Sequence, residues 1–260
     1  MTEISNKNPH SLTTLFFTEM WERFSYYGMR ALLVLYLVNS LNYSNAEALH
    51  IYAIYTGLVY LTPILGGYLA DRYLGTQKTI FIGGITMMLG HFLMAFPNLL
   101  YLAMGLLIIG NGYFKPNIST LLGKLYKTND TRRDSGFSIF YIGINLGAFL
   151  APLIVGYVGE TINWHYGFAI AGIGMLAGLM QFYFGQNKII EEDTSKKTKK
   201  LDSSDWKIIL FFSLINIPLI LLIFKINIFI NLYIYEILFI SLMYLLILFL
   251  KKKNKINLMN

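Results

Sequence analysis

The chain has 260 residues, of which 55% are hydrophobic and only 13% are charged. Soluble domains carry roughly 25% charged residues, so this composition indicates a membrane protein. Cysteine is absent, which excludes a disulfide framework and a thiolate metal site. The net charge of +7 comes from basic clusters between apolar runs. Such clusters lack the interleaved aromatic residues of a nucleic-acid-binding stripe, so no nucleic-acid partner is expected.

Apolar stretches of about 20 residues recur along the chain, and each is long enough to cross a bilayer as a helix. They lie near residues 13–39, 50–70, 79–97, 99–123, 136–159, 164–185, 206–225 and 232–250. The segment between the sixth and seventh stretches is polar and charged. The sequence therefore predicts an all-α membrane protein of about eight spans. Its parts are a six-helix bundle at 1–185, a cytoplasmic linker at 186–205, and a transmembrane helical hairpin with a basic tail at 206–260.

The charges of the loops set the expected orientation. Lysine and arginine follow the second, fourth, sixth and eighth spans, whereas the loops after the first, third and fifth contain neither. Cytoplasmic loops are enriched in these residues, so we expect both termini in the cytoplasm and a multi-pass location in a bacterial cell membrane. Lys225 alone falls on the outer side. The polar segment 1–10 precedes a long, charge-bearing apolar run, which indicates an uncleaved insertion signal.

Formal charges lie inside the first expected span. They are Glu19, Glu22, Arg23 and Arg30. A charge at the bilayer centre costs about 3 kcal/mol on insertion scales, so four would cost about 10 kcal/mol if uncompensated. At about 100° per residue the charges share one helix face with Tyr26 and Tyr27. This face is typical of a substrate or proton pathway, and the alternative is an ion pair that only holds a helix bundle together.

One internal repeat joins the second and fifth spans. Residues 60–71 and 149–160 share Leu, Pro, Gly and Tyr at matching positions, and an acid, Asp71 or Glu160, closes each segment. The two segments cross the membrane in opposite directions. This indicates an inverted repeat of three spans plus three, as within each half of a major facilitator transporter. Chance similarity between two glycine-containing apolar helices is the alternative.

Three motifs follow one another at fixed spacing. They are ExxERFSYYG at 19–28, GGYLADRYLG at 66–75 and FSIFYIGINLGAF at 137–149, with GNGYFKPNIS at 110–119 between the last two. In this order the motifs resemble those of the proton-dependent oligopeptide transporters of the major facilitator superfamily. The resemblance covers about residues 1–185, the N-terminal half of such a transporter. The hairpin at 206–260 is similar in position to an extra helical pair between the halves of bacterial members.

The resemblance implies a proton-coupled symporter of di- and tripeptides, driven by the proton gradient without a cofactor. The implied proton-coupling residues are Glu19, Glu22, Arg23 and Lys115. The implied substrate-binding residues are Arg23, Tyr26, Tyr27, Arg30, Tyr60, Lys115 and Asn145. A guanidinium fork suits a carboxylate, so Arg23 and especially Arg30 are expected to receive the peptide's carboxylate. Protonation of a glutamate would then free Arg23 for substrate. Asp71 and Arg72 are expected to form a cytoplasmic gate.

Purely structural roles are the alternative for the same residues. Arg23 would simply neutralise its two glutamate neighbours, Lys115 beside Pro116 would pair with an acid, and tyrosines in spans are often interfacial. The four histidines are scattered without ligand spacing, and no nucleophile–base pair stands out. We therefore expect neither a metal site nor enzymatic activity.

The second six-span half has no counterpart after residue 200. Alternating access requires one half to rock against another, and a lone half would leave the charged stripe facing lipid. We therefore expect a partner that is a separately encoded second half or a second copy of the chain. The alternatives are a truncated, non-transporting remnant and an accessory or regulatory membrane subunit.

Overall fold

The computed structural model describes residues 8–127 and 129–192, together with residues 218, 220, 240, 241 and 244. Its elements in chain order are α1 (Ser11–Asn39), α2 (Asn45–Leu61), α3 (Pro63–Leu69), the π-helix η1 (Ala70–Leu74), α4 (Thr76–Leu93), the 3-10 helix η2 (Pro97–Leu99), α5 (Leu100–Lys124), α6 (Arg133–Ala151), the π-helix η3 (Pro152–Gly156), α7 (Tyr157–Thr161) and α8 (Trp164–Glu192). Over these ranges the fold is helical, with no strand, as the sequence predicts.

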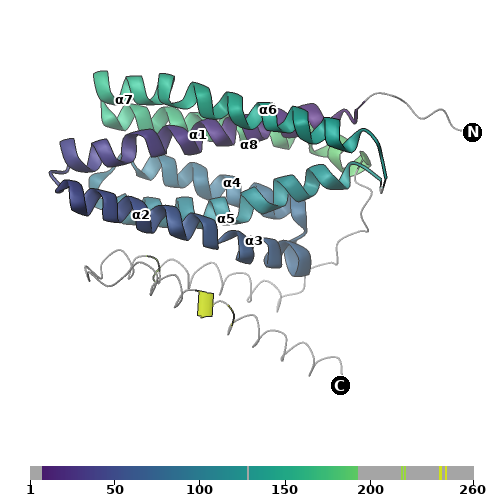
Figure 1. Ribbon diagram of the computed structural model, residues 1–260, viewed down its shortest axis with the longest axis horizontal. Helices are drawn as coiled ribbons and strands as arrows, with labels where there is room; N and C mark the ends of the chain where they lie inside the picture. The colour runs from purple at the N-terminus through teal and green to yellow at the C-terminus, as the bar shows by residue number, and fades with distance from the viewer. Residues whose placement is uncertain are drawn as a thin grey trace, which may run out of the picture.

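The first six expected spans correspond to six passes along one bundle (Figure 1). Four of the passes are long and apolar enough to cross a membrane. They are Asn45–Leu74, Pro97–Lys124, Arg133–Thr161 and Trp164–Ile189. The sixth pass continues as helix to Glu192, so the first seven residues of the segment expected as a linker, 186–192, belong to α8. The two spans expected near 206–225 and 232–250 lie almost wholly outside the described residues.

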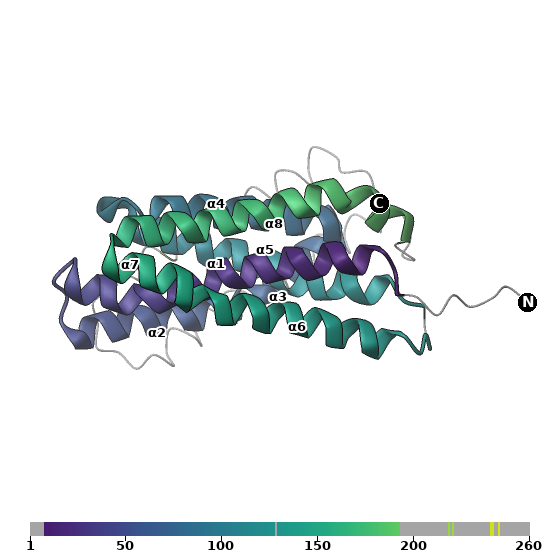
Figure 2. The ribbon, with the colours of Figure 1, turned by 90° about the horizontal axis from the view of Figure 1, so that it is seen from above.

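Helix α1 lies at the centre of the bundle. It packs against α6 and α8 on either side and also contacts α2, α4 and α5 (Figure 2). Small residues allow the close approach, because a Cβ at Gly147 of α6 would lie 2.2 Å from the carbonyl oxygen of Met20 in α1. The charged helix is therefore enclosed by its neighbours.

Prolines interrupt the second and fifth passes at matching positions of the expected repeat. Pro63 separates α2 from α3, which runs into η1, and Pro152 opens η3 at the end of α6. Proline removes a backbone donor and clashes with the preceding turn, so it ends regular α-helix at these points. Both interrupted passes also contain a π-helical turn, but at different places: η1 follows α3, whereas η3 begins at Pro152 itself.

The basic loops gather at one end of the bundle. The start of α1, the η1–α4 junction, the α5–α6 loop and the end of α8 all lie there (Figure 1). The opposite end holds the loops 40–44, 94–96 and 162–163, which contain neither lysine nor arginine. Cytoplasmic loops of membrane proteins are enriched in lysine and arginine, so this segregation is consistent with the expected orientation, which stays a prediction.

Candidate functional site

One guanidinium holds two carboxylates inside the first helix. Arg23 donates through Nε and Nη2 to both carboxylate oxygens of Glu22, with 2.6 Å between Nη2 and Oε1. The same Nε lies 3.2 Å from Oε1 of Glu19, one turn earlier. The exposed fractions are 1% for Arg23, 0% for Glu22 and 2% for Glu19. With both glutamates ionised, these three side chains carry a net charge of −1.

A residue of α5 joins this group. Nδ2 of Asn111 donates to Oε1 of Glu22 over 3.3 Å, and Asn111 is fully buried. Asn111 was not among the residues expected from the sequence, although an amide in the middle of an apolar span was a usable signal. Oε2 of Glu19 and Oδ1 of Asn111 are buried without a hydrogen-bond partner in the part of the chain that the structure describes. Glu19, Glu22, Arg23 and Asn111 together are called the charge cluster below.

The second arginine of α1 is surrounded by tyrosines. Nε of Arg30 donates to the hydroxyl of Tyr52 in α2 over 2.9 Å, and its Nη2 donates to the same oxygen. Its Cζ lies 5.3, 5.5 and 5.8 Å from the ring centroids of Tyr52, Tyr26 and Tyr27. Cζ of Arg23 lies 5.0 Å from the Tyr26 ring, so Tyr26 stands between the two arginines. Tyr52 was not among the expected site residues, because a tyrosine in a span is often interfacial.

Lys115 lies one helical turn beyond Asn111 on α5. Its Nζ is 5.7 Å from the ring centroid of Tyr60 in α2, and Tyr60 is 62% exposed. Lys115 itself is half-buried and forms no salt bridge to any residue within the described ranges. Lys115 therefore has no ion-pair contact with an acid among these residues, although it lies within electrostatic range of Glu19 and Glu22. A lysine that is only partly covered remains accessible to a ligand.

The remaining expected site residues lie elsewhere. Asn145 of α6 is exposed, on the side of the helix away from Gly143 and Gly147, which face α1. Asp71 and Arg72 are exposed in η1 at the basic end of the bundle. The structure thus brings together the expected residues of α1, with Lys115 and Tyr60 beside them. Asn145, Asp71 and Arg72 lie apart from this group.

The expectation that a lone bundle would expose its charged stripe to lipid is wrong for most of that stripe. Glu19, Glu22 and Arg23 are enclosed by the neighbouring helices, and only Arg30 remains half-buried. The reason is the central position of α1, which the sequence pattern did not reveal. Arg23 and the amide of Asn111 offset part of this charge within the bundle, and one surplus carboxylate remains when both glutamates are ionised.

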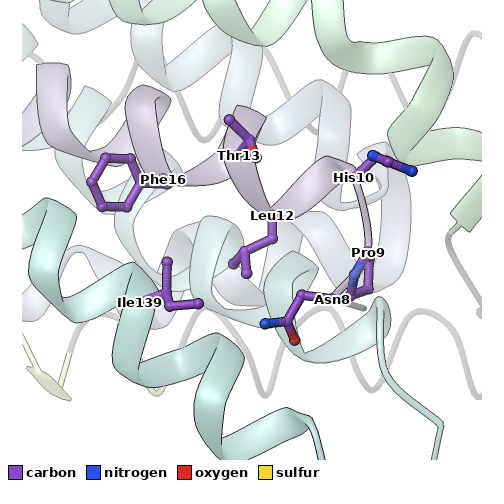
Figure 3. Close-up of a pocket in the computed structure, with 7 residues that line it drawn as sticks. All are labelled: Asn8, Pro9, His10, Leu12, Thr13, Phe16 and Ile139. Carbon is purple, nitrogen blue, oxygen red and sulfur yellow. The ribbon is translucent and has the colours of Figure 1, made fainter. Parts of the chain in front are cut away.

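A small cavity of about 330 Å³ lies at the start of α1, away from the charge cluster. Leu12 and Phe16 of α1 border it together with Ile139 of α6, and Asn8, Pro9, His10 and Thr13 complete its wall (Figure 3). None of the expected site residues lines this cavity. Over the described ranges no group of three histidine, cysteine or acidic side chains is placed to hold a metal ion.

The chain is similar to a known protein family and to two bacterial transporters. The PTR2 model, described as POT family, matches residues 77–222. The uncharacterized transporter YclF of Bacillus subtilis (strain 168) is 53% identical over 189 residues, which cover 70% of this chain and 38% of YclF. The di-/tripeptide transporter of Lactococcus lactis subsp. lactis (strain IL1403) is 48% identical over 205 residues, which cover 75% of this chain and 41% of that protein.

Solved structures agree with these relatives. A crystal structure of a mutant of the peptide transporter POT in complex with alafosfalin is 43% identical to this chain. It superposes with a TM-score of 0.73 over 84% of this chain and 47% of its own. This chain thus spans about 40% of the length of the curated relatives and about half of the solved transporter. The family match over more than half of its residues, together with these relatives, shows that the chain belongs to the POT family.

Proposed function

We propose that this chain supplies the N-terminal half of a proton-coupled symporter of di- and tripeptides. The relatives support peptides as the substrate class, since one is named a di-/tripeptide transporter. The observation that carries the proposal is the fork of Arg23, which Glu22 and Glu19 share inside the bundle. A buried set of three charges with one surplus carboxylate is a place for a transferable proton. The driving force is the proton gradient, and no cofactor is needed.

The proton is assigned to Glu19. Both oxygens of Glu22 accept from Arg23, and one of them also accepts from Asn111, so Glu22 is held as a carboxylate. Glu19 has a single ion pair, and its second oxygen has no partner among the described residues. Protonation of Glu19 removes the surplus negative charge and loosens the hold on Arg23. A proton and a carboxylate substrate can then arrive together.

The peptide's carboxylate is assigned to Arg30, with Arg23 as its second contact. Arg30 is half-buried, and the rings of Tyr26, Tyr27 and Tyr52 hold its guanidinium in place. A preorganised guanidinium loses less freedom when it binds a carboxylate bidentately. Lys115 and Tyr60 would extend the binding surface through their partly covered or exposed side chains, and Asn145 would be a separate contact on the exposed side of α6. Such a lining recognises termini and backbone, which suits peptides of varied sequence.

The exposed part of this site requires a facing wall. We assign that wall to a second six-helix bundle, either a separate half or a second copy of the chain, which packs on the six-helix unit of residues 1–185. The basic end of the bundle, with Asp71 and Arg72 as gate residues, would face the cytoplasm together with both termini. In this arrangement Lys115 and Tyr60 lie between the two bundles.

Reconstitution tests the proposal. Residues 1–205 are fused to the C-terminal half of the Lactococcus lactis di-/tripeptide transporter, and the chimera is placed in proteoliposomes with a labelled dipeptide and an inward proton gradient. Accumulation above that of empty liposomes, abolished by a protonophore, supports the proposal. A monodisperse, helical chimera that neither accumulates nor exchanges the peptide would contradict it. The chain alone is assayed in parallel, and gradient-driven uptake by it would identify a second copy as the partner.

A further inference from the structure

Close packing fixes the backbone of α5 on both sides of Asn111. A Cβ at Gly110 would lie 2.7 Å from the carbonyl oxygen of Gly83 in α4. A Cβ at Gly112 would lie 2.5 Å from Cβ of Thr62, on the second pass. These approaches leave no room for either neighbouring helix to slide without disturbing α5. The position from which the Asn111 side chain reaches α1 is therefore set by α4 and by the second pass.

The chemistry of the contact defines the orientation of the amide. A carboxylate only accepts hydrogen bonds, so the NH₂ group of Asn111 must face Glu22. The contacted oxygen, Oε1, is also the one that accepts from Nη2 of Arg23. Glu22 thus receives donors from two helices, whereas Glu19 receives its ion pair from α1 alone within the described residues.

We propose that Asn111 is a positioning residue that keeps Glu22 ionised and paired with Arg23, and thereby directs the transported proton to Glu19. The proposal rests on the proton-coupled function assigned to the charge cluster. The charged and titratable groups around Glu22 are Glu19, Arg23 and Tyr26 of α1, Tyr55 of α2 and Lys115 of α5. In the described part of the chain, Glu22 accepts side-chain hydrogen bonds from two residues only, Arg23 and Asn111.

The contact also ties the proton site to a second helix. Lys115 follows Asn111 by one turn of α5 and reaches the Tyr60 ring. A shift of the Glu22 carboxylate, such as the one expected when protonation of Glu19 loosens the hold on Arg23, would therefore act on α5 at Asn111, one turn from a residue assigned to the substrate. Removing the amide cuts this link without touching any charged residue.

Infrared spectroscopy of the full chain in nanodiscs tests the proposal without any transport step. Lowering the pH produces the carbonyl band of a protonated carboxyl group. The band that forms first as the pH falls is assigned to Glu19 if it is lost in Glu19→Gln, and to Glu22 if it is lost in Glu22→Gln. With asparagine at position 111, we expect the band to vanish in Glu19→Gln and to remain in Glu22→Gln. In Asn111→Leu, which has a similar volume but no donor, we expect the assignment to change to Glu22.

Control variants separate positioning from packing. Asn111→Thr keeps a donor and should retain the Glu19 assignment, and Ser119→Ala, at an exposed position of the same helix, should do the same. Asn111→Ala replaces the leucine variant if the latter fails to give a monodisperse, helical protein. A first band that stays with Glu19 in both variants without a donor overturns the role of Asn111 and leaves the proton assignment intact. A first band that belongs to Glu22 in the unmodified chain instead rejects the proton assignment, and with it this inference.

Discussion

Gly66 of α3 packs directly on the carbonyl oxygen of Gly112 in α5, so closely that a Cβ at residue 66 would lie 1.9 Å from that oxygen. Pro116 has no N–H to give to this carbonyl, which therefore stands outside the hydrogen-bond ladder of α5. Two further bonds fix the crossing. Thr62 donates to the carbonyl oxygen of Ile108 over 2.9 Å, and Asn117 donates to that of Gly66 over 3.2 Å. The segment of the second pass that contains Thr62 and Gly66 is thereby fixed against α5.

Substitution of Gly66 by alanine should destabilise the bundle. The new methyl group would meet backbone, which cannot turn away as a side chain would, so we expect a loss of about 1–3 kcal/mol or more. Gly67→Ala is the matched control, because a Cβ there meets nothing within 4 Å. Denaturant unfolding in detergent, followed by circular dichroism, measures both. Equal midpoints for the two variants would show that the α3–α5 crossing is less tight than described.

The two glutamates of the charge cluster should differ in transport. In the chimera, Glu19→Gln mimics the protonated state, so we expect gradient-driven accumulation to be lost while counterflow exchange of labelled peptide persists. Glu22→Gln removes the carboxylate that holds the fork of Arg23. Breaking a buried ion pair costs about 3–5 kcal/mol, so we expect a lower midpoint of unfolding and weak exchange. Retained accumulation in Glu19→Gln would remove this residue from the proton pathway.

The hydroxyl of Tyr52 should contribute to the affinity for peptide. It accepts two hydrogen bonds from Arg30, whereas the ring alone supplies only the cation–π contact. A hydrogen bond to a charged group is worth roughly 1.5 kcal/mol or more, which corresponds to about a tenfold change. We therefore expect Tyr52→Phe in the chimera to raise the KM for dipeptide by about fivefold to tenfold, with a smaller effect on kcat.

A second tyrosine provides the comparison. Tyr43 donates to or accepts from Tyr101 over 3.1 Å, far from Arg30, and Tyr43→Phe should leave the KM unchanged. An equal rise of KM in both variants would point to a general loss of order among the helices, and an unchanged KM in Tyr52→Phe would show that the rings alone place Arg30.

The fold was largely accessible from the sequence, because its determinants are local. Apolar stretches of the right length predicted the six helical passes, four of which are long and apolar enough to cross a membrane. The prolines in the repeated segments marked the two interrupted passes. The end of the sixth helix was misplaced, since the polar residues 186–192 continue α8 beyond its apolar part. Nothing in the periodicity of α1 indicated that this charged helix occupies the centre, because that depends on the glycines of α6 and α8.

From the sequence, the site could be predicted only for the residues that lie on a single helix, α1. Glu19, Glu22, Arg23 and Arg30 could be grouped by helical spacing alone, and the ion pairs confirm the grouping for the first three. Asn111 and Tyr52 come from α5 and α2, and their contacts with α1 depend on how the three helices cross. A single sequence contains no signal for such crossings. The functional roles of all expected site residues stay predictions, those of Lys115, Asn145, Asp71 and Arg72 among them.

The loop between α5 and α6 should respond to acid. Asp130 accepts from the backbone N–H of Arg132 at 3.0 Å and from its guanidinium at 2.9 and 2.7 Å. These hydrogen bonds lower the pKa of Asp130 from 3.8 to about 2. Because the folded pKa is depressed, the contribution of the pair to loop order is complete above pH 3.8 and is lost as the pH falls through about 2. Carboxyl carbon NMR of the labelled chain should follow this titration.

Amide exchange provides the structural measurement for the same loop. The backbone N–H of Arg132 should be protected at neutral pH in the unmodified chain and lose protection in Asp130→Asn, which cannot hold the guanidinium with a charge. Asp134→Asn, at an exposed position in the first turn of α6, should leave that protection unchanged. High salt should weaken the pair, since charges on a loop are screened by ions. A carboxyl titration at the ordinary aspartate value, with protection insensitive to Asp130→Asn, would contradict the bidentate geometry of Arg132.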